Sequence, residues 1–251
     1  MEEKVVFKRP KLLRDIPTHF CPGCHHGIIH RILAECIEEL KIEEDTICVG
    51  SVGCSVLVYN YIDLDAVEAP HGRAAAVATG VKRARPENIV FAYQGDGDLA
   101  SIGFNEAIHA GTRGEKITII FVNNGVYGMT GGQMAPTTII GQKTTTSPFG
   151  RDPSREGYPL KVAEIMALLD GVAFSARVAV NSIKNIQKAK KALKKAFEVQ
   201  IKRLGLGFVE FLSACPTNWH MTPLEANKRI DEEVIKFFPL GIFKDMESKD
   251  V

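Results

Sequence analysis

Hydrophobic residues recur along the chain with two different periods. Over residues 27–40 they return every three to four positions, which predicts an amphipathic helix. The apolar positions of this helix are Ile28, Ile29, Ile32, Leu33, Cys36, Ile37 and Leu40. Elsewhere the apolar residues gather in short continuous runs, which are typical of strands buried on both faces.

Short apolar runs and helical patterns then take turns along the chain. The predicted strands cover 46–49, 88–93, 116–122, 172–180 and 207–212. The predicted helices cover 73–85, 99–112, 161–169, 182–202 and 225–238. Because strands that alternate with helices usually pair in parallel, the pattern predicts an α/β fold. Its central sheet would be mostly parallel, with helices on both faces.

Three segments fall outside this alternation. Residues 1–20 read as a polar arm, residues 123–160 as a loop rich in Gly, Thr and Pro, and residues 239–251 follow the last helix. We therefore expect an N-terminal arm (1–20), one α/β domain (21–238) and a C-terminal tail (239–251). A loop as long as 123–160 within a compact domain is usually functional or disordered.

Composition narrows the class of protein. The 251 residues are 45% hydrophobic and 24% charged, which suits one or two globular domains. A net charge of +1 gives no global field that favours nucleic acid or an acidic membrane surface. No apolar run approaches the roughly 20 residues that span a bilayer. The N-terminal sequence has acidic residues and no apolar core, so no secretory signal is expected. We expect a cytoplasmic protein whose six cysteines stay reduced.

The stretch YQGDGDLASIGF, residues 93–104, places two carboxylates in a glycine-rich turn directly after a predicted strand. The next predicted strand runs into Asn123 and Asn124. Because ligands bind beyond the carboxyl ends of parallel strands, Asp96 and Asn124 are expected to meet there. Their oxygens, together with a phosphate, are ligands that Mg²⁺ prefers. Alternatively, Asp98 or Asp96 only caps the helix that begins near residue 99.

The spacing of the two turns carries a resemblance. GDG, followed after 25 residues by NN, resembles the motif that binds thiamine diphosphate. The resemblance implies Mg²⁺ held by Asp96, Asn124 and the backbone carbonyl of Val126. It also implies a diphosphate that lies against the residues Gly97, Asp98, Gly128 and Met129.

Four cysteines form a second candidate site. Cys21 and Cys24 make a C-x-x-C pair, Cys54 lies in SVGCS, and Cys215 lies in SACPTNW. Four thiolates can hold zinc or an iron–sulfur cluster, and buried thiols beside an ordinary turn are the third reading. Cys36 and Cys48 fall within a predicted helix and strand and are interpreted as core residues.

The motifs occur in one characteristic order: CPGC, GCS, HGRAAAVATGVK, GDGD, NNGVYGMTGGQ, TTTSPFG and CPTNW. From residue 17 to about 223 the chain closely resembles the β subunit of 2-oxoacid:ferredoxin oxidoreductases, which binds thiamine. This resemblance implies a three-layer thiamine-diphosphate-binding fold and one [4Fe–4S] cluster on Cys21, Cys24, Cys54 and Cys215. The residues that would line the cofactor are Val52, Gly53, Cys54, Ser55, His71 and Gly72.

The resemblance also implies an activity, which is the oxidative decarboxylation of a 2-oxoacid with coenzyme A to acyl-CoA, CO₂ and reduced ferredoxin. In this family the glutamate that activates the aminopyrimidine comes from the α subunit, and no matching residue is found here. The catalytic acid is therefore expected from an α subunit. Ferredoxin, a γ subunit and a ferredoxin-like δ subunit are further candidate partners. The chain leans toward a 2-oxoglutarate or branched-chain 2-oxoacid enzyme.

Two other functions remain open on the sequence. One is a thiamine-dependent decarboxylase or carboligase subunit without a cluster, in which the cysteines are dispensable. The other is a regulatory subunit that binds phosphate and is stapled by zinc. The first alternative predicts no iron, and the second predicts zinc and no thiamine.

Overall fold

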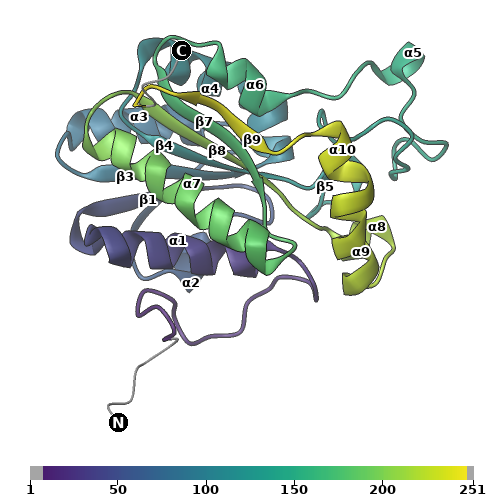
Figure 1. Ribbon diagram of the computed structural model, residues 1–251, viewed down its shortest axis with the longest axis horizontal. Coiled ribbons are helices and arrows are strands. Elements are labelled where there is room, and N and C mark those ends of the chain that lie inside the picture. Colours follow the sequence, from purple (N-terminus) through teal and green to yellow (C-terminus); the bar gives the residue numbers. More distant parts are fainter. Residues whose placement is uncertain (1–7, 248–251) are drawn as a thin grey trace.

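The computed structural model describes residues 8–247 of the chain (Figure 1). Residues 1–7 of the expected arm, with the N-terminal sequence weighed above as a signal, and residues 248–251 of the expected tail lie outside the described residues. Within the described part, a seven-stranded sheet has the order β2-β1-β3-β4-β8-β7-β9. Its strands are β1 (Thr46–Ser51), β2 (Asp65–Ala69), β3 (Ile89–Gly95), β4 (Thr118–Asn123), β7 (Val172–Ala179), β8 (Leu206–Leu212) and β9 (Gly241–Asp245).

Helices cover both faces of this sheet, which makes three layers (Figure 1). On one face lie α1 (His26–Leu40) and α7 (Ile183–Ile201), and on the other lie α3 (Ala74–Ala84), α4 (Phe104–Arg113) and α6 (Val162–Ala167). All pairs in the sheet are parallel except β7 with β9. The expected three-layer α/β fold with a mostly parallel sheet is therefore confirmed.

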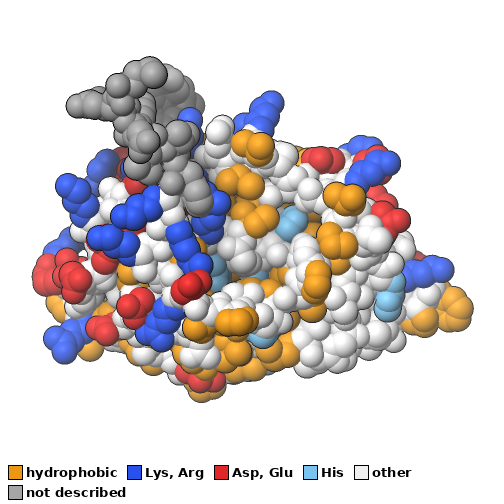
Figure 2. All heavy atoms as spheres, turned by 90° about the horizontal axis from the view of Figure 1, so that it is seen from below, with side chains coloured by type: hydrophobic (Ala, Val, Ile, Leu, Met, Phe, Trp, Pro, Cys, Tyr) orange, Lys and Arg blue, Asp and Glu red, His pale blue; other side chains and the backbone are white. Residues whose placement is uncertain are grey.

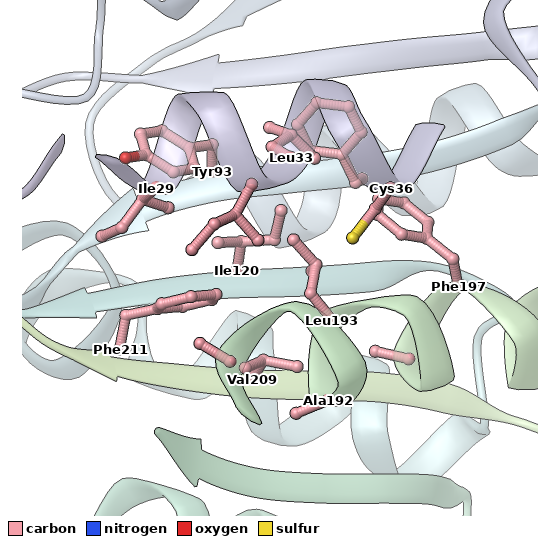
Figure 3. Packing of buried hydrophobic residues seen from close by; sticks show 14 of the residues in the cluster. Ile29, Leu33, Cys36, Tyr93, Ile120, Ala192, Leu193, Phe197, Val209 and Phe211 are labelled. Carbon is pink, nitrogen blue, oxygen red and sulfur yellow. The ribbon is translucent and has the colours of Figure 1, made fainter. Parts of the chain in front are cut away.

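The apolar face of α1 packs against α7 and the strands β3, β4 and β8 (Figure 3). Ile29, Leu33 and Cys36 are fully buried there, as the helical period predicts. Cys36 is 0% and Cys48 2% exposed, so their interpretation as core residues is confirmed. A second apolar cluster fills the space between the sheet and α3, α4 and α6.

The face seen from below is divided (Figure 2). Charged side chains gather on its left side, whereas histidine and hydrophobic side chains surround a hollow near its centre. The lysines of α7 pair in part with acidic residues of α1, since Lys190 Nζ lies 2.8 Å from Glu35 and 2.6 Å from Glu39. In the described part of the chain, no helix has the length and hydropathy that crossing a membrane requires.

Two strands of the seven-stranded sheet were not predicted. β2 is a short edge strand, and β9 comes from the expected C-terminal tail and pairs antiparallel with β7. The division expected at residue 239 therefore does not separate β9 from the domain. The arm also packs on the domain: Leu12 is 9% exposed, and its carbonyl accepts a hydrogen bond from Asp63 N at 2.8 Å.

The long segment 123–160 is ordered by hydrogen bonds. It contains a small hairpin of β5 (Val126–Tyr127) and β6 (Gln133–Met134) and the short helix α5 (Pro153–Glu156). Arg151, 5% exposed, donates to the carbonyls of Pro136 and Thr138, each at 2.8 Å. Because one buried guanidinium ties together several turns, this loop can present backbone groups in fixed positions.

The remaining helical pieces are short, and apart from η1, which precedes β1, they follow β1, β3 or β8 in the sequence. They are η1 (Glu43–Asp45), α2 (Val58–Tyr61), η2 (Gly97–Ile102), α8 (Pro216–Trp219), α9 (Pro223–Arg229), η3 (Ile230–Val234) and α10 (Ile235–Phe237). The last three make up the helix expected over 225–238. Thr222 caps α9 in a capping box with Glu225.

Candidate cofactor site

A cavity of about 170 Å³ lies beyond the carboxyl ends of β1, β3 and β4. Apart from Gly72, every residue predicted to contact the cofactor lines it: Val52, Gly53, Cys54, Ser55, His71, Gly97, Asp98, Gly128 and Met129. The three predicted magnesium ligands, Asp96, Asn124 and Val126, line it too. Segments that are far apart in the sequence thus meet at one cavity because their strands are parallel neighbours.

The side chain of Asp98 connects three segments around the cavity by hydrogen bonds. Its Oδ1 accepts hydrogen bonds from Ser51 Oγ at 2.6 Å, His71 Nδ1 at 2.7 Å and Gly72 N at 2.5 Å, and its Oδ2 accepts one from Gln94 Nε2 at 2.5 Å. The carboxylate is 1% exposed. Its oxygens are therefore occupied by protein donors, and Asp98 can offer a phosphate only its backbone.

The bond to Asp98 also orients His71. Because Nδ1 donates to a buried carboxylate, the neutral imidazole presents its other nitrogen, Nε2, as an acceptor. The His71 side chain is 43% exposed and lines the cavity. Gly72, with φ +78°, allows the tight approach, since a Cβ there would lie 2.6 Å from Ile102. Gly72 thus supports the cavity through Asp98.

Asp96 differs from Asp98 because its carboxylate accepts mainly backbone hydrogen bonds. Gly97 N donates to Oδ1 at 2.8 Å and Val126 N donates to Oδ2 at 3.2 Å. Within residues 8–247 no basic side chain forms an ion pair with it, although it is only 3% exposed. Burial therefore raises the pKa of Asp96 to about 7, against the opposing effect of these backbone donors. A divalent cation would supply the missing positive charge.

The loop that follows β3 and the loop that follows β4 approach each other closely. A Cβ on Gly97 would lie 2.8 Å from the Tyr127 ring, and one on Gly128 would lie 3.2 Å from Cys54 Sγ. Asn124 Oδ1 accepts a hydrogen bond from Val126 N at 3.0 Å. Glycine at 97 and 128 therefore permits the close approach of the two loops, because Tyr127 and Cys54 occupy the space that a Cβ would fill.

The four predicted cluster cysteines gather beside this cavity. Cys21 and Cys24 lie in the turn before α1, Cys54 follows β1, and Cys215 follows β8. The turn before α1 and the segment after β8 are joined by a hydrogen bond of 3.1 Å from Ala214 N to His25 Nδ1. Burial, with the other three thiols nearby, raises the pKa of Cys24 to about 12. Burial likewise raises the pKa of Cys54 to about 11, and Cys215 and Cys21 add to that effect.

These thiols are not arranged around a single ion. Within the described residues, no three His, Cys, Asp or Glu side chains form a group that could hold one metal ion. A mononuclear zinc site requires that kind of convergence on one point. The thiols nonetheless raise one another's pKa, and a cationic centre among them would reverse that shift.

Comparisons with known proteins agree with this geometry. Residues 51–210 match the family model described as "Thiamine pyrophosphate enzyme, C-terminal TPP binding domain". The 2-oxoglutarate synthase subunit KorB of Methanocaldococcus jannaschii is 38% identical over 243 residues, which are 94% of this chain and 84% of the relative. This chain belongs to the thiamine-diphosphate-binding subunits of the 2-oxoacid:ferredoxin oxidoreductases.

Other members of the family extend the comparison. The ketoisovalerate oxidoreductase subunit VorA of Methanothermobacter marburgensis is 49% identical over 97% of this chain, which spans only 51% of that relative's length. A solved structure of 2-oxoglutarate:ferredoxin oxidoreductase from Magnetococcus marinus, with 2-oxoglutarate, coenzyme A and succinyl-CoA bound, has a TM-score of 0.76 and 25% identity. The structural match covers 96% of this chain and 85% of the chain in that structure.

For this thiamine-binding subunit, the residues present fit the implied magnesium and diphosphate. The donor set at the cavity combines one carboxylate without a cationic partner, an amide oxygen and a backbone carbonyl, which suits a hard cation that also keeps phosphate ligands. Gly97, Asp98, Gly128 and Met129 all line the cavity, so an anion bound there would lie against these segments.

Several site residues of this family member were missed by the sequence interpretation. His26, Gly95, Tyr127 and Thr130 also line the cavity. His26 is 2% exposed, and its Nδ1 lies 2.6 Å from Tyr93 Oη. Its place two residues after Cys24, at the start of the helix that follows the C-x-x-C turn, was the available signal.

Proposed function

We propose that this chain supplies the thiamine diphosphate and iron–sulfur site of a 2-oxoacid:ferredoxin oxidoreductase. The complete enzyme would convert a 2-oxoacid and coenzyme A into acyl-CoA and CO₂, with release of a proton and transfer of two electrons, one at a time, to oxidised ferredoxin. The observation that carries this proposal is the position of Cys54. It lines the cofactor cavity, and it also lies close to Cys21, Cys24 and Cys215.

In this proposal Asp96, Asn124 and the carbonyl of Val126 hold Mg²⁺. The backbone at Gly97, Asp98, Gly128 and Met129 receives the diphosphate. When bound, thiamine diphosphate supplies an electron sink that allows the 2-oxoacid to lose CO₂. The chain's own contribution is to fix the ion and the diphosphate, and His71 Nε2 is available there as a hydrogen-bond acceptor toward the bound molecules.

Cys21, Cys24, Cys54 and Cys215 would hold one [4Fe–4S] cluster. One-electron acceptors of this kind suit a reaction that releases two electrons in sequence. Because Cys54 belongs to the turn Val52–Ser55 that lines the cavity, the same turn would contact both cofactors. All six cysteines are free thiols, which suits the reducing cytoplasm that we propose for this protein.

A partner subunit completes the site in this proposal. Among the residues that line the cavity, the acidic ones are Asp96 and Asp98, and neither is free to act as the expected activating glutamate. We propose that an α subunit closes the cavity and brings this group. The names of the relatives as subunits support an assembly. Ferredoxin accepts the electrons, and γ and ferredoxin-like δ subunits are further proposed partners.

For the substrate we propose a branched-chain 2-oxoacid rather than 2-oxoglutarate. Among residues 8–247, no lysine or arginine lines the cavity, so this lining offers no cation for a second carboxylate. Val52 and Met129 add apolar surface at the cavity and are 36% and 50% exposed. The higher identity to a ketoisovalerate oxidoreductase subunit, 49% against 38% for a 2-oxoglutarate synthase subunit, supports the same choice.

The test is anaerobic reconstitution of the chain with its partner subunits, followed by measurement of 2-oxoacid-dependent, CoA-dependent reduction of a low-potential acceptor. We expect activity with 2-oxoisovalerate to exceed that with 2-oxoglutarate. A reversed preference would overturn the substrate proposal alone. Activity without iron would instead favour a decarboxylase or carboligase subunit that lacks a cluster.

Iron and sulfide content tests the cluster ligands directly. Cys215→Ser is expected to lose or damage the cluster, whereas Cys36→Ser, a change in the core beneath α1, is expected to keep it. Equal iron and sulfide in the parent and both variants would contradict the four-cysteine set. Zinc in place of iron in anaerobically purified protein would favour the regulatory alternative.

A further inference from the structure

The short helix α8 begins directly after Cys215 and holds the loop that carries the proposed magnesium and diphosphate contacts. Asn218 Nδ2 donates to the carbonyl of Gly128 at 3.0 Å, and Trp219 Nε1 donates to the carbonyl of Asn124 at 3.1 Å. The two bonds grip the loop Asn124–Gly128 at both of its ends. A four-residue helix thus fixes the position of a loop that lies about 90 residues earlier in the sequence.

The Asn218 amide has a second partner, because Nδ2 also lies 3.2 Å from Cys215 Sγ. The rest of the side chain packs tightly, since a Cβ on Gly132 would lie 3.0 Å from Asn218 Cβ. The amide therefore has little freedom to turn away from either partner. One NH₂ group thus contacts both a proposed cluster ligand and the loop that contains proposed ligands of the other cofactor.

A second contact joins the same two sites. A Cβ on Gly128 would lie 3.2 Å from Cys54 Sγ, so the loop also lies against another proposed cluster ligand. The loop is therefore bounded by Cys54 on one side and by Asn218 on another. Any displacement of the thiols when they are not bound to iron would be transmitted to the Gly128 carbonyl through these contacts.

We propose that Asn218 is a positioning residue through which occupancy of the cluster site strengthens the binding of thiamine diphosphate. This inference rests on the proposed function. A cluster-bound thiolate accepts a stronger hydrogen bond than a free thiol, which fixes the amide in the orientation that also holds Gly128. Coupling between two binding sites is reciprocal, so the bound thiamine diphosphate in turn stabilises the cluster against loss of iron.

The experiment measures thiamine diphosphate affinity in the presence of Mg²⁺ by calorimetry on the complete complex, prepared anaerobically with its cluster and again after removal of iron by chelation. We expect the parent to bind about tenfold more tightly with the cluster than without it, the effect typical of a lost supporting contact. In Asn218→Leu, which keeps the shape and removes the donors, the two affinities are expected to agree within about twofold.

A redox measurement adds a readout that a purely structural role would not change. Hydrogen bonds to cluster sulfur stabilise the reduced, more negative state, so the midpoint potential of Asn218→Leu is expected to be lower than that of the parent. Thr217→Ala is the matched control. Thr217 is exposed on the same helix and its side chain bonds none of these groups, so it is expected to change neither quantity.

Trp219→Phe is the second variant, and it decides the question if Asn218→Leu does not fold. It keeps an aromatic ring in the core, removes the donor to Asn124 and reduces the ring surface under Arg229. The affinity ratio between the two forms is expected to fall below that of the parent, because α8 then holds the loop by one bond fewer. A parent whose affinity does not depend on the cluster, or an Asn218→Leu that keeps the parent's ratio, overturns the inference. A parent that binds neither cofactor would instead overturn the proposed function on which it rests.

Discussion

Two groups of buried charge lie at different strands of the sheet, and they differ in whether each charge has an oppositely charged partner. Near β7 and β8, Arg177 lies between Glu210 at 3.0 Å and Glu164, and its guanidinium stacks over the rings of Phe238 and Phe243. At the carboxyl ends of β1, β3 and β4, Asp96 and Asp98 are as deeply buried, but no Lys or Arg in the described chain pairs with them.

The difference distinguishes a charge cluster that is paired within the fold, around Arg177, from the carboxylate of Asp96, which has no cationic partner in the described chain. Burial disfavours the Arg177 cation, but its two glutamates outweigh that effect and raise its pKa. Each charge of this cluster thus has an oppositely charged partner within the chain, although burial still raises the pKa of Glu210. Asp98 is satisfied by four neutral or histidine donors, whereas Asp96 keeps an unbalanced charge at a cavity. An uncompensated buried carboxylate is thus a stronger pointer to a cation site than burial alone.

The largest effect is expected from breaking the ion-paired cluster around Arg177. Arg177→Met leaves Glu210 buried without its cation, and we expect a loss of about 3–5 kcal/mol in the free energy of unfolding, measured by urea titration. The matched control is Arg14→Met, which removes an exposed pair with Asp63 and should cost about 1 kcal/mol or less. Equal losses in the two variants would contradict this account of the buried cluster.

The second-largest effect is expected from removing the charge of Asp96. Changes in supporting contacts of a metal site already cost about 10- to 100-fold, so Asp96→Asn is expected to weaken Mg²⁺-dependent thiamine diphosphate binding by more than about 100-fold. The same change removes a buried charge and is expected to leave the stability of the cofactor-free protein unchanged or slightly higher. Calorimetry and thermal unfolding measure the two quantities. Tight binding by Asp96→Asn would rule out the metal assignment.

Protonation of Asp96 predicts a pH dependence. Burial raises its pKa from 3.8 to about 7, so between about pH 4 and pH 7 the folded, cofactor-free chain holds more proton at this group than the unfolded chain. The contribution of Asp96 to stability therefore decreases as the pH rises through this window and is constant above it. Magnesium competes with the proton, so cofactor affinity should fall about tenfold per pH unit below pH 7. Asp96→Asn should remove that slope, and an unchanged slope in the variant would assign it to another group.

The smallest expected effect concerns the satisfied carboxylate. Ser51→Ala removes one of the four donors to Asp98 and leaves those from His71, Gly72 and Gln94. We expect a cost of about 1 kcal/mol in unfolding free energy, since a bond to a charged group is lost while other donors remain. Urea titration measures it. A loss as large as that of Arg177→Met would mean that Asp98 is less well satisfied than its bonds indicate.

The period of the hydrophobic residues was sufficient to predict most of the core layers. The helix expected over 27–40 and the strand over 88–93 correspond to α1 and β3, because each buries a face or a run that the local sequence already specifies. β2 was missed because four of its five residues are exposed, so it lacks an apolar pattern. β9 was missed because its strand character depends on pairing with β7, about 70 residues earlier.

At the candidate site, sequence reasoning predicted which turns would meet, but not what each side chain does there. Asp96 and Asp98 are two positions apart in the same motif, and only the structure distinguishes their roles. The donors that occupy Asp98 come from β1, from the turn before α3 and from β3. The double contact of Asn218 was likewise invisible, since it depends on where the distant Gly128 carbonyl lies.

The antiparallel strand β9 has a consequence for how the molecule can associate with others. It covers the edge of β7 and becomes the border strand itself, since within residues 8–247 no strand pairs with its outer side. At the other border no strand within residues 8–247 pairs with the outer side of β2, which carries the exposed acids Asp65 and Glu68. Like charges there disfavour the addition of a second copy. The acids of β2 therefore disfavour edge-to-edge pairing at that border.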